Sequence, residues 1–435
     1  MKIALINHGC AKNLVDAELM LGMLDKKGHQ ITLDDKEADI VIVNTCSFIH
    51  DAEQESVQSI LEMIENGKRV IVTGCLSQKY NDELKKAIPE LSGMVGTSNL
   101  TDVVKIIEDL EQGKEYESII SDKPHYYYPE DTARQQITVG ASSYLKIGEG
   151  CNYKCGYCII PKLRGPYISR PIENIVKEAK ELVAKGVTEI ILIAQDTSSY
   201  GIDLYGKQAL PELLRELNKI DNLSWIRIMY AYPTQMTDEL IDAIASLDKV
   251  VKYVDIPLQH SHPEVLKRMR RPVMDYTKLV EKIRNKIPNV SIRTTLIVGY
   301  PGETEEEFEH LYNFVKNVKF DRMGAFEYSR EKGTYSYGLK PQIDDKIKKE
   351  RRDKLMELQQ KISLKNNQKY IGSTLKCIVE GYTDDGVIIL RSEHDAPEID
   401  GVVYATSDRE VIPGDLENVK ITKVDEYDLF GEIED

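Results

Sequence analysis

The sequence predicts an α/β protein in three parts: an N-terminal doubly wound parallel sheet, a central partial (β/α)6 barrel of the TIM type, and a small C-terminal antiparallel β-barrel. Three observations predict this. Strand-like apolar runs alternate with helix-period segments up to about residue 120, and six further runs alternate with helices between residues 137 and 340. After residue 370 the pattern changes to short strands separated by glycine turns. We place domains at 1–120, 137–368 and 369–435, with a linker at 121–136.

In the N-terminal part, three apolar runs each lead to a cysteine. Runs at 3–6, 40–43 and 70–72 precede Cys10, Cys46 and Cys75 respectively. In a doubly wound sheet, ligands lie beyond the carboxyl ends of the strands, so we expect the three cysteines at one edge. A mononucleotide site is the rival use of that edge, but no G-x-G-x-x-G or Walker motif follows these strands.

Two helices are expected between these strands. Helical periodicity covers 14–27 and 52–66. The side chains expected to point inward are Leu19, Met20, Met23, Val57, Ile60, Leu61 and Ile64.

A second group of cysteines lies close together in the chain. Cys151, Cys155 and Cys158 follow the spacing C-x3-C-x2-C. Zinc sites usually combine two C-x2-C pairs or add histidines, and neither occurs here. Iron–sulfur clusters take thiolate ligands, and three cysteines leave one iron of a cubane open for a substrate. The alternative is three cysteines packed in the core, but packing alone does not account for so many cysteines in so short a stretch.

The central region supplies six strand-like runs, at 144–147, 189–194, 225–229, 253–256, 291–298 and 323–328. Six β/α units are too few for a complete eight-stranded barrel. Barrel sites form at the carboxyl ends of strands. That rule nominates Gln195, Asp196, Gln259, His260, Tyr328, Ser329 and the turn at 299–303. Each could instead be a turn or cap residue, and His260 could be a structural histidine.

The C-terminal part is acidic. Strands are expected at 374–379, 387–390, 402–405 and 419–424, with Cys377 a packed core thiol. Residues 370–435 hold five Lys and Arg against seventeen Asp and Glu, a difference of −12 within a chain total of −15. A phosphate-binding surface needs the opposite sign, whereas a basic protein partner would be attracted. A merely solubilising acidic module is the alternative.

Composition and cysteine content indicate the cellular compartment. The chain has 435 residues, 41% hydrophobic and 30% charged, with seven cysteines, strand-length apolar runs and no signal-peptide pattern at its start. We expect a cytoplasmic protein without membrane association, whose cysteines serve metal or catalytic roles rather than disulfides.

The motifs resemble those of a known family. The spacing of Cys151, Cys155 and Cys158, with Tyr157 before the last, resembles the signature of radical S-adenosylmethionine (SAM) enzymes. The stretches 9–18, 44–49 and 74–76 look like the N-terminal domain of the methylthiotransferases within that superfamily. Ala11-Lys12 after the first cysteine is most similar to the RimO branch, which modifies an aspartate of small-subunit ribosomal protein S-twelve; Ala17 departs from the Ser or Thr of that pattern. The last part resembles the TRAM domain.

The resemblance implies two [4Fe-4S] clusters and two uses of SAM. Cys151, Cys155 and Cys158 would hold the cluster that binds SAM and cleaves it to a 5′-deoxyadenosyl radical, and Cys10, Cys46 and Cys75 would hold an auxiliary cluster that presents sulfur. Hydrogen abstraction from an unactivated carbon needs such a cofactor-derived radical, because no side-chain base can deprotonate that carbon. By resemblance the product is a 3-methylthioaspartyl residue, with no catalytic side chain beyond the cluster ligands.

Contacts to SAM are expected at the strand ends. The turn at 299–303 resembles the family's SAM-binding turn, and Thr304 and Glu307 form a capping box behind it. Arg293 could bind the SAM carboxylate or form a buried ion pair. The residues expected to contact SAM are Gln195, Asp196, Arg293, Gly299, Gly302 and Glu303.

Other polar segments have simpler predicted roles. Arg164, Arg170, Arg268, Arg270 and Arg271 are expected near the barrel mouth, the last three on a solvated helix face. The tyrosines at 126–128 are expected to attach the linker to a neighbouring domain. A long helix at 344–369 is expected to turn Ile347, Leu355, Leu358 and Ile362 to one side.

Four functions remain open. A ribosomal-protein methylthiotransferase would act on basic protein S-twelve or the ribosomal subunit, receive electrons from a donor protein and work as a monomer. A transfer-RNA methylthiotransferase would need a basic final barrel. A non-catalytic metal-stapled RNA-binding module would be colourless with zinc, and a radical SAM oxidoreductase using the second cluster as a relay would put no sulfur in its product.

Overall fold

The computed structural model describes residues 1–47, 50–130, 134–137 and 140–434. Phe48 and Ile49 of the second motif stretch lie outside the described residues, as do positions 131–133 of the expected linker. The chain divides into two compact units, each of which is taken by itself. Unit 1 comprises residues 1–139, 148–154 and 158–170, and unit 2 comprises residues 140–147, 155–157 and 171–435.

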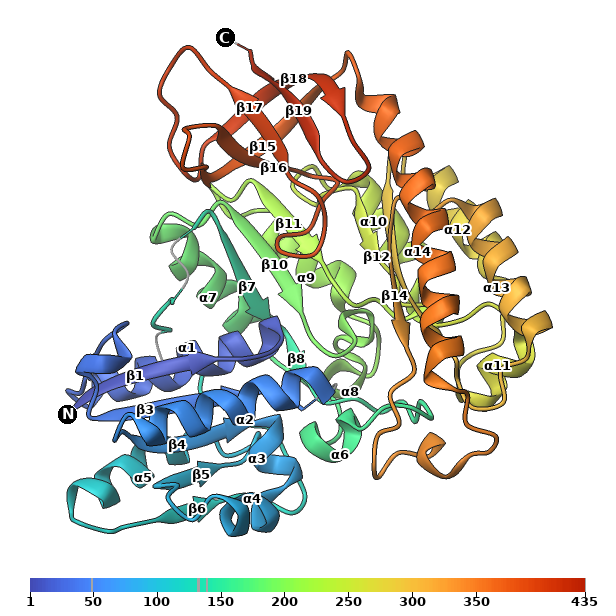
Figure 1. Cartoon of the computed structure of the whole chain (residues 1–435). Coiled ribbons are helices and arrows are strands. Elements are labelled where there is room, and N and C mark those ends of the chain that lie inside the picture. Colours follow the sequence, from blue (N-terminus) through green and yellow to red (C-terminus); the bar gives the residue numbers. More distant parts are fainter. Residues whose placement is uncertain (48–49, 131–133, 138–139, 435) are drawn as a thin grey trace. The chain divides into compact units, whose positions relative to one another are not determined.

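Unit 1 is built on a six-stranded parallel sheet (Figure 1), which confirms the predicted doubly wound N-terminal fold. The strands are β1 (Lys2–Asn7), β2 (Gln30–Ile31), β3 (Ile40–Thr45), β4 (Arg69–Gly74), β5 (Gly93–Val95) and β6 (Glu117–Ile119), in the order β2-β1-β3-β4-β5-β6. The sequence did not single out β2, β5 and β6, because their two or three residues are too short to show periodicity. The chain order reverses between β1 and β3, where such sheets bind ligands.

The other elements of unit 1 are helices and one small two-stranded ribbon. The helices are α1 (Ala11–Lys26), η1 (Asp35–Glu37), α2 (His50–Glu65), α3 (Cys75–Lys79), α4 (Asn81–Ala87), α5 (Asp102–Glu111) and α6 (Ile160–Arg164). The ribbon pairs β8 (Gly148–Glu149) with β9 (Ile168–Ser169), so it joins the two flanks of the second cysteine group.

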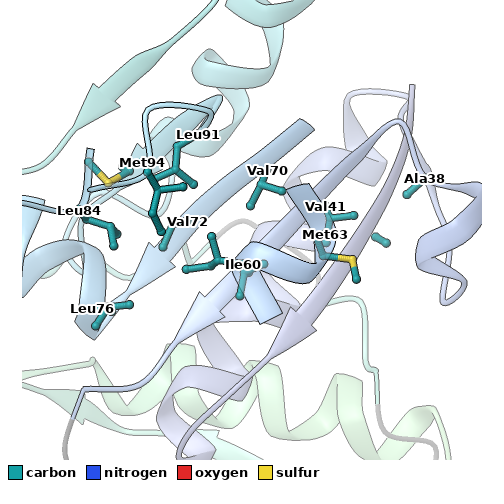
Figure 2. Packing of buried hydrophobic residues seen from close by; sticks show 13 residues of the cluster. Ala38, Val41, Ile60, Met63, Val70, Val72, Leu76, Leu84, Leu91 and Met94 are labelled. Carbon is teal, nitrogen blue, oxygen red and sulfur yellow. The ribbon is translucent and has the colours of Figure 1, made fainter. Parts of the chain in front are cut away.

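Figure 2 shows the core of this sheet, where α2, α3 and α4 cover one face. Val41, Val70 and Val72 from the strands meet Ile60 and Met63 of α2, and all five side chains are buried. The predicted inward residues of α1 are buried, as is Ile60 of α2. The expectation for Leu61 was wrong: its side chain is 40% exposed, because the neighbouring strands cover only the narrower stripe through Val57, Ile60 and Ile64.

Unit 2 contains six parallel barrel strands in two groups of three (Figure 1). One group has the order β11-β10-β7 and the other β12-β13-β14, and an isolated parallel bridge between Ile226 and Val250 links them. The strands are β7 (Ser142–Lys146), β10 (Glu189–Ile193), β11 (Trp225–Ile228), β12 (Tyr253–Asp255), β13 (Ser291–Val298) and β14 (Arg322–Glu327). This arrangement agrees with the predicted partial barrel.

Helices connect these strands. They are α7 (Ile172–Ala184), η2 (Thr197–Ser199), α8 (Ile202–Tyr205), α9 (Leu210–Leu217), η3 (Pro233–Gln235), α10 (Asp238–Ser246), α11 (Pro263–Arg268), α12 (Tyr276–Lys286), α13 (Glu305–Val318), η4 (Ser336–Gly338), α14 (Asp345–Asn367) and η5 (Gln368–Tyr370). The capping box of Thr304 and Glu307 is present at the start of α13.

Helix α14 packs on β14 through a polar face. Leu355 and Ile362 are buried as predicted, but Ile347 is 41% exposed, so the predicted apolar stripe was wrong at that end. Gln359 and Asn366 instead point inward and donate hydrogen bonds to the carbonyl of Phe320. Polar side chains take these inward positions because they satisfy a buried backbone group.

The C-terminal barrel is closed by five strands. They are β15 (Thr374–Tyr382), β16 (Ile388–Ser392), β17 (Val403–Thr406), β18 (Leu416–Val424) and β19 (Leu429–Ile433), in the order β15-β16-β17-β19-β18. Sequence analysis missed β19, which pairs parallel with β17, because Gly431 interrupts its pattern. A Cβ on Gly431 would lie 2.2 Å from the carbonyl oxygen of Lys420, so this glycine permits close strand approach rather than a turn. Cys377 is wholly buried in this core, as expected.

The end of β16 and the loop that follows it contact all six strands of the partial barrel, at or near the first residue of each. Arg391 binds Glu189 of β10 and Ser142 of β7. The other contacts are Arg227 to the carbonyl of Glu393, Tyr253 to Asp400, Arg293 to Asp400, and Arg322 to Asp395. These contacts hold the starting ends of the strands, opposite the ends where the site is expected.

Replacing Arg391 by alanine should destabilise this part of the fold by about 3–5 kcal/mol, because Glu189 would lose a buried ion partner. Trp225, the single tryptophan, lies beside Glu189 in the sheet register, so its fluorescence during urea unfolding reports on this region. The matched control is Arg409→Ala, whose half-exposed pair with Glu417 should contribute no more than about 1 kcal/mol. Equal midpoints for the two variants would contradict the prediction.

The same pair makes stability depend on pH in the acid range. Burial raises the pKa of Glu189, but Arg391 and Arg227 outweigh burial and hold that pKa at about 2, below its ordinary value of 4.5. A carboxylate with a lowered folded pKa contributes stability above pH 4.5 and loses it as the pH falls toward 2. In the Arg391→Ala variant this loss should become shallower.

Candidate functional site

The first cysteine group lies at the ends of three neighbouring strands. Cys10 follows β1, Cys46 follows β3 and Cys75 follows β4, and these strands are adjacent in the sheet. Cys10 is exposed, Cys46 half-buried and Cys75 buried. Cys10 is also the N-cap residue of α1. The arrangement expected from strand order alone is therefore present.

Two glycines let the three turns come close. Gly9 has φ +109°, and a Cβ there would lie 3.4 Å from Sγ of Cys46. Gly74 has φ +95°, and its Cβ would lie 2.5 Å from the carbonyl oxygen of Thr45. A side chain at either position would push the strand ends apart, and left-handed φ values favour glycine in any case.

Cys75 has a buried cationic neighbour. Arg164 donates a hydrogen bond to Sγ of Cys75 over 3.7 Å, and its guanidinium also binds Asp16 at 2.7 Å and Glu149 at 3.3 Å. Burial raises the pKa of the Cys75 thiol, while the charge of Arg164 opposes that rise. Arg164 was expected near the barrel mouth; within unit 1 it lies beside the first cysteine group.

Helix α1 carries the polar residues that build this environment, and sequence reasoning missed their role. Asn13, Asp16 and Glu18 are each at most 2% exposed. Asn13 donates to the carbonyl of Thr45 and accepts from Arg164, and Asp16 accepts from Arg164 and Tyr126. Glu18 binds Arg134 and the backbone N–H of Ile137. The sequence did contain a signal for this role, because these three polar residues lie within one and a half turns of one helix.

The three linker tyrosines differ in how far they are buried. Tyr126 and Tyr128 are buried, whereas Tyr127 is 71% exposed. Tyr128 lies under the guanidinium of Arg170, 3.4 Å from it, and Arg170 also binds Glu130. The predicted attachment role therefore holds for two of the three tyrosines, within unit 1.

The residues of the first group fit an iron–sulfur cluster better than a single ion. Within the described residues, no three His, Cys, Asp or Glu side chains converge on one metal ion. In a cubane each thiolate binds a different iron, so the sulfurs need not converge. Three thiols on adjacent strand ends, which two glycines allow to come close together, match that requirement.

The second cysteine group is divided between the units. Cys151 and Cys158 lie in unit 1 and Cys155 in unit 2. The N–H of Cys151 donates to the carbonyl of Gly165, and Asn152 accepts from the N–H of Tyr167, so the ribbon β8–β9 anchors this end of the loop. All three thiols are half-buried.

In unit 2, Cys155 lies beside Arg271. Nη1 of Arg271 is 4.0 Å from Sγ of Cys155, and its guanidinium lies 4.3 Å from the Tyr232 ring. The expectation of a solvated Arg271 was wrong, because this residue is 8% exposed and its guanidinium donates to the carbonyl of Pro257. Gly156 hydrogen-bonds to Met269 and Ser336, and a Cβ there would lie 2.6 Å from Oη of Tyr300.

The other two arginines of that segment have partners. Arg268 is half-buried and binds Glu307 through both Nη atoms. Arg270 is exposed and lies 3.5 Å from the Tyr335 ring.

Asp196 and the turn at 299–303 have internal partners. Asp196 caps η2 by accepting from Ser198 and Ser199, and burial raises its pKa. Glu303 is 3% exposed and accepts from the N–H of Gly299 and from Arg351, with His260 at 3.6 Å. Gly299 and Gly302 have left-handed φ of +71° and +78°. Glu303 therefore shapes the turn, and its contact with SAM stays a prediction.

Arg293 lies near the start of β13, away from the strand's carboxyl end. It forms ion pairs with Asp255 at 3.2 Å and Asp400 at 3.4 Å. The structure favours the buried ion pair that the sequence left open.

Further polar groups lie at the strand ends. Gln195 follows β10 and is half-buried. Gln259 has φ +72°, and its buried Oε1 accepts no hydrogen bond from the described residues. Tyr328 donates to Ser336. Lys146, the last residue of β7, is wholly buried and was not predicted; a charged residue within the strand-like run at 144–147 was the signal.

Three known protein families match three successive parts of the chain. Residues 145–315 match the radical SAM superfamily, residues 2–96 match uncharacterized protein family UPF0004, and residues 371–433 match the TRAM domain. The three matches agree with the order of the three predicted parts.

Full-length relatives are highly similar. A protein of Caldanaerobacter subterraneus subsp. tengcongensis, named ribosomal protein uS12 methylthiotransferase RimO, is 50% identical over 436 residues, 99% of each chain. A Clostridioides difficile protein of the same name is 47% identical over 440 residues, covering 100% of this chain and 99% of its own.

Solved structures share the fold at low identity. The radical SAM methyltransferase TsrM of Kitasatospora setae has a TM-score of 0.56 at 15% identity, over 74% of this chain and 72% of its own. The cobalamin-dependent radical enzyme OxsB has a TM-score of 0.52 at 12% identity, over 83% and 56%. No helix in the described part of the chain is both long and apolar enough to span a bilayer.

Proposed function

Because the chain belongs to the RimO family of radical SAM methylthiotransferases, we propose that it installs a methylthio group on the β-carbon of an aspartate of ribosomal protein uS12. The observation that carries the proposal is the presence of two separate cysteine triads. One follows three adjacent strands of the N-terminal sheet, and the other flanks the first barrel strand. The reaction needs a radical source and a sulfur site, and two triads serve two such roles.

Each triad would hold one [4Fe-4S] cluster. Cys151, Cys155 and Cys158 would ligate the cluster that binds SAM, and Cys10, Cys46 and Cys75 the auxiliary one. When bound, these clusters supply the electron that cleaves SAM and an iron site for sulfur, and a second SAM supplies the methyl group.

The chain's own residues prepare the two sites. Gly9 and Gly74 keep the three strand ends close, and Arg164 compensates negative charge beside Cys75. In unit 2, Arg271 brings a positive charge to Cys155, and Glu303 shapes the turn after β13 through Gly299. Gln195, Asp196, Gly299, Gly302 and Glu303 remain the proposed surroundings of SAM.

The charge of the last barrel supports a protein substrate. Asp395 and Asp400 are buried in ion pairs, but acidic residues still predominate on the barrel's exposed surface. The exposed ones include Glu380, Asp384, Asp385, Asp408, Glu410, Glu432 and Glu434. Such a surface attracts a basic ribosomal protein and repels RNA. We place the reaction in the cytoplasm, with a monomeric enzyme and an electron-donor protein.

The proposal is tested by anaerobic incubation of the cluster-loaded protein with SAM, a reductant and either uS12 or transfer RNA, followed by mass spectrometry. We expect the mass of a methylthio group on one aspartate of uS12 and no modification of the RNA. Modification of the RNA alone would overturn the choice of substrate, and a product without sulfur would favour the relay alternative.

A further inference from the structure

We propose that Arg164 is a positioning residue for the auxiliary cluster: its guanidinium holds the Cys75 thiolate through a hydrogen bond and raises the reduction potential of the cluster bound there. The inference rests on the cluster assignment proposed above and adds a residue that is not a cluster ligand. It concerns unit 1 alone, in which Arg164, Cys75 and Cys10 all lie.

The first support is geometric. Arg164 ends α6, six residues after Cys158, and its side chain is 2% exposed. Nη2 donates to Sγ of Cys75 over 3.7 Å and to Oδ1 of Asn13, while Nη1 donates to Asp16 at 2.7 Å and Glu149 at 3.3 Å. A planar fork with several donors can serve these partners together, which a lysine ammonium does less well.

The second support is the packing that fixes α6. Ile159 and Leu163 form an apolar cluster with Cys75. The hydroxyl of Thr97 donates to the carbonyl of Leu163. Gly165, with φ +76°, allows the chain to pass Pro124, because a Cβ there would lie 2.1 Å from the Pro124 carbonyl oxygen. These contacts fix the backbone of α6, and Asp16, Glu149 and Asn13 hold the guanidinium itself beside Cys75.

The third support is charge. Asp16 and Glu149 are 2% and 0% exposed, so two carboxylates surround one guanidinium before any thiolate is counted. Thiolate ligation adds negative charge beside Cys75, with Cys10 close by. Hydrogen bonds to cluster sulfurs and nearby positive charge favour the reduced, more negative state. Removing Arg164 should therefore lower the potential.

The expected magnitude follows from the bond type. Because a hydrogen bond to a charged group is among the stronger ones, the Arg164→Gln change should make reduction of the cluster about tenfold less favourable, which is about 59 mV for a one-electron couple.

The test uses full-length protein in which Cys151, Cys155 and Cys158 are replaced by alanine, so that the auxiliary cluster is the one reported. Redox titration followed by electron paramagnetic resonance gives the midpoint potential, and iron content and near-ultraviolet circular dichroism report loading and folding. We expect a lower potential for Arg164→Gln and a smaller decrease for Arg164→Lys. Arg170→Lys changes another buried arginine of unit 1, paired with Glu130, and should leave the potential unchanged.

Asp16→Asn provides a test with the opposite sign and keeps Arg164 in place. It removes a negative charge beside the same guanidinium, so the potential should rise. Unchanged potentials in Arg164→Gln and Asp16→Asn, with iron content as in the parent, would overturn the role of Arg164 alone. Failure of the parent triple variant to bind iron would overturn the auxiliary-cluster assignment, and the role of Arg164 with it.

Discussion

Replacing Cys10 with alanine should abolish methylthiolation of uS12 while reductive cleavage of SAM persists. Cys10 caps α1 at the end of β1, within the strand-end group, and loss of a thiolate ligand removes one iron contact of the auxiliary cluster. Changes to residues that only support metal ligands already reduce affinity or activity by 10- to 100-fold, so we expect at least about 100-fold loss here. Product formation by mass spectrometry and release of 5′-deoxyadenosine measure the two activities separately.

The matched control is Cys377→Ala. Cys377 is also a free thiol, but it is wholly buried in the core of the C-terminal barrel, where burial raises its pKa. The smaller side chain should lower stability slightly and leave both activities near the parent level. Survival of methylthiolation in Cys10→Ala would show that the strand-end group does not hold the sulfur site.

Replacing Cys155 with alanine should abolish both activities. Cys155 belongs to the triad that would bind SAM, so its loss stops radical formation before any sulfur chemistry. We expect at least about 100-fold less 5′-deoxyadenosine and no methylthio product. The same two measurements apply, with Arg409→Ala as a surface control. Continued SAM cleavage in Cys155→Ala, with iron bound, would contradict the role assigned to this triad.

The two variants together separate the roles of the triads. Cys10→Ala should lose methylthiolation and keep SAM cleavage, because SAM cleavage precedes sulfur insertion. Cys155→Ala should lose both activities, because methylthiolation does not proceed without the radical. A shared electron relay, by contrast, would predict no sulfur in the product of the unmodified enzyme.

Local patterns in the sequence were sufficient for the order and type of the elements. Apolar periodicity located β1, β3 and β4, and chain order was enough to place Cys10, Cys46 and Cys75 on one sheet edge. Parallel strands end at the same edge, so a residue's position after its strand predicts its place in space. The spacing of Cys151, Cys155 and Cys158 is likewise local.

Which side chains are buried was decided by the tertiary structure. Leu61 and Ile347 are apolar and exposed, whereas Asp16, Arg164 and Arg271 are charged and buried. Periodicity shows which face of a helix is apolar but not which other segments pack against that face. A charged group is buried where oppositely charged or polar partners from distant segments contact it. Asp16 and Arg164 are 148 residues apart in sequence, so no local window contains the pair.

The sequence by itself thus determined an α/β chain with two cysteine triads and an acidic final barrel, because these features depend on composition, spacing and chain order. Only the tertiary structure placed Arg164 against Cys75, Arg271 against Cys155, and the end of β16 with its following loop against the starts of six strands. The physical reason is that a buried charge needs partners, and those partners come from segments that only folding brings together.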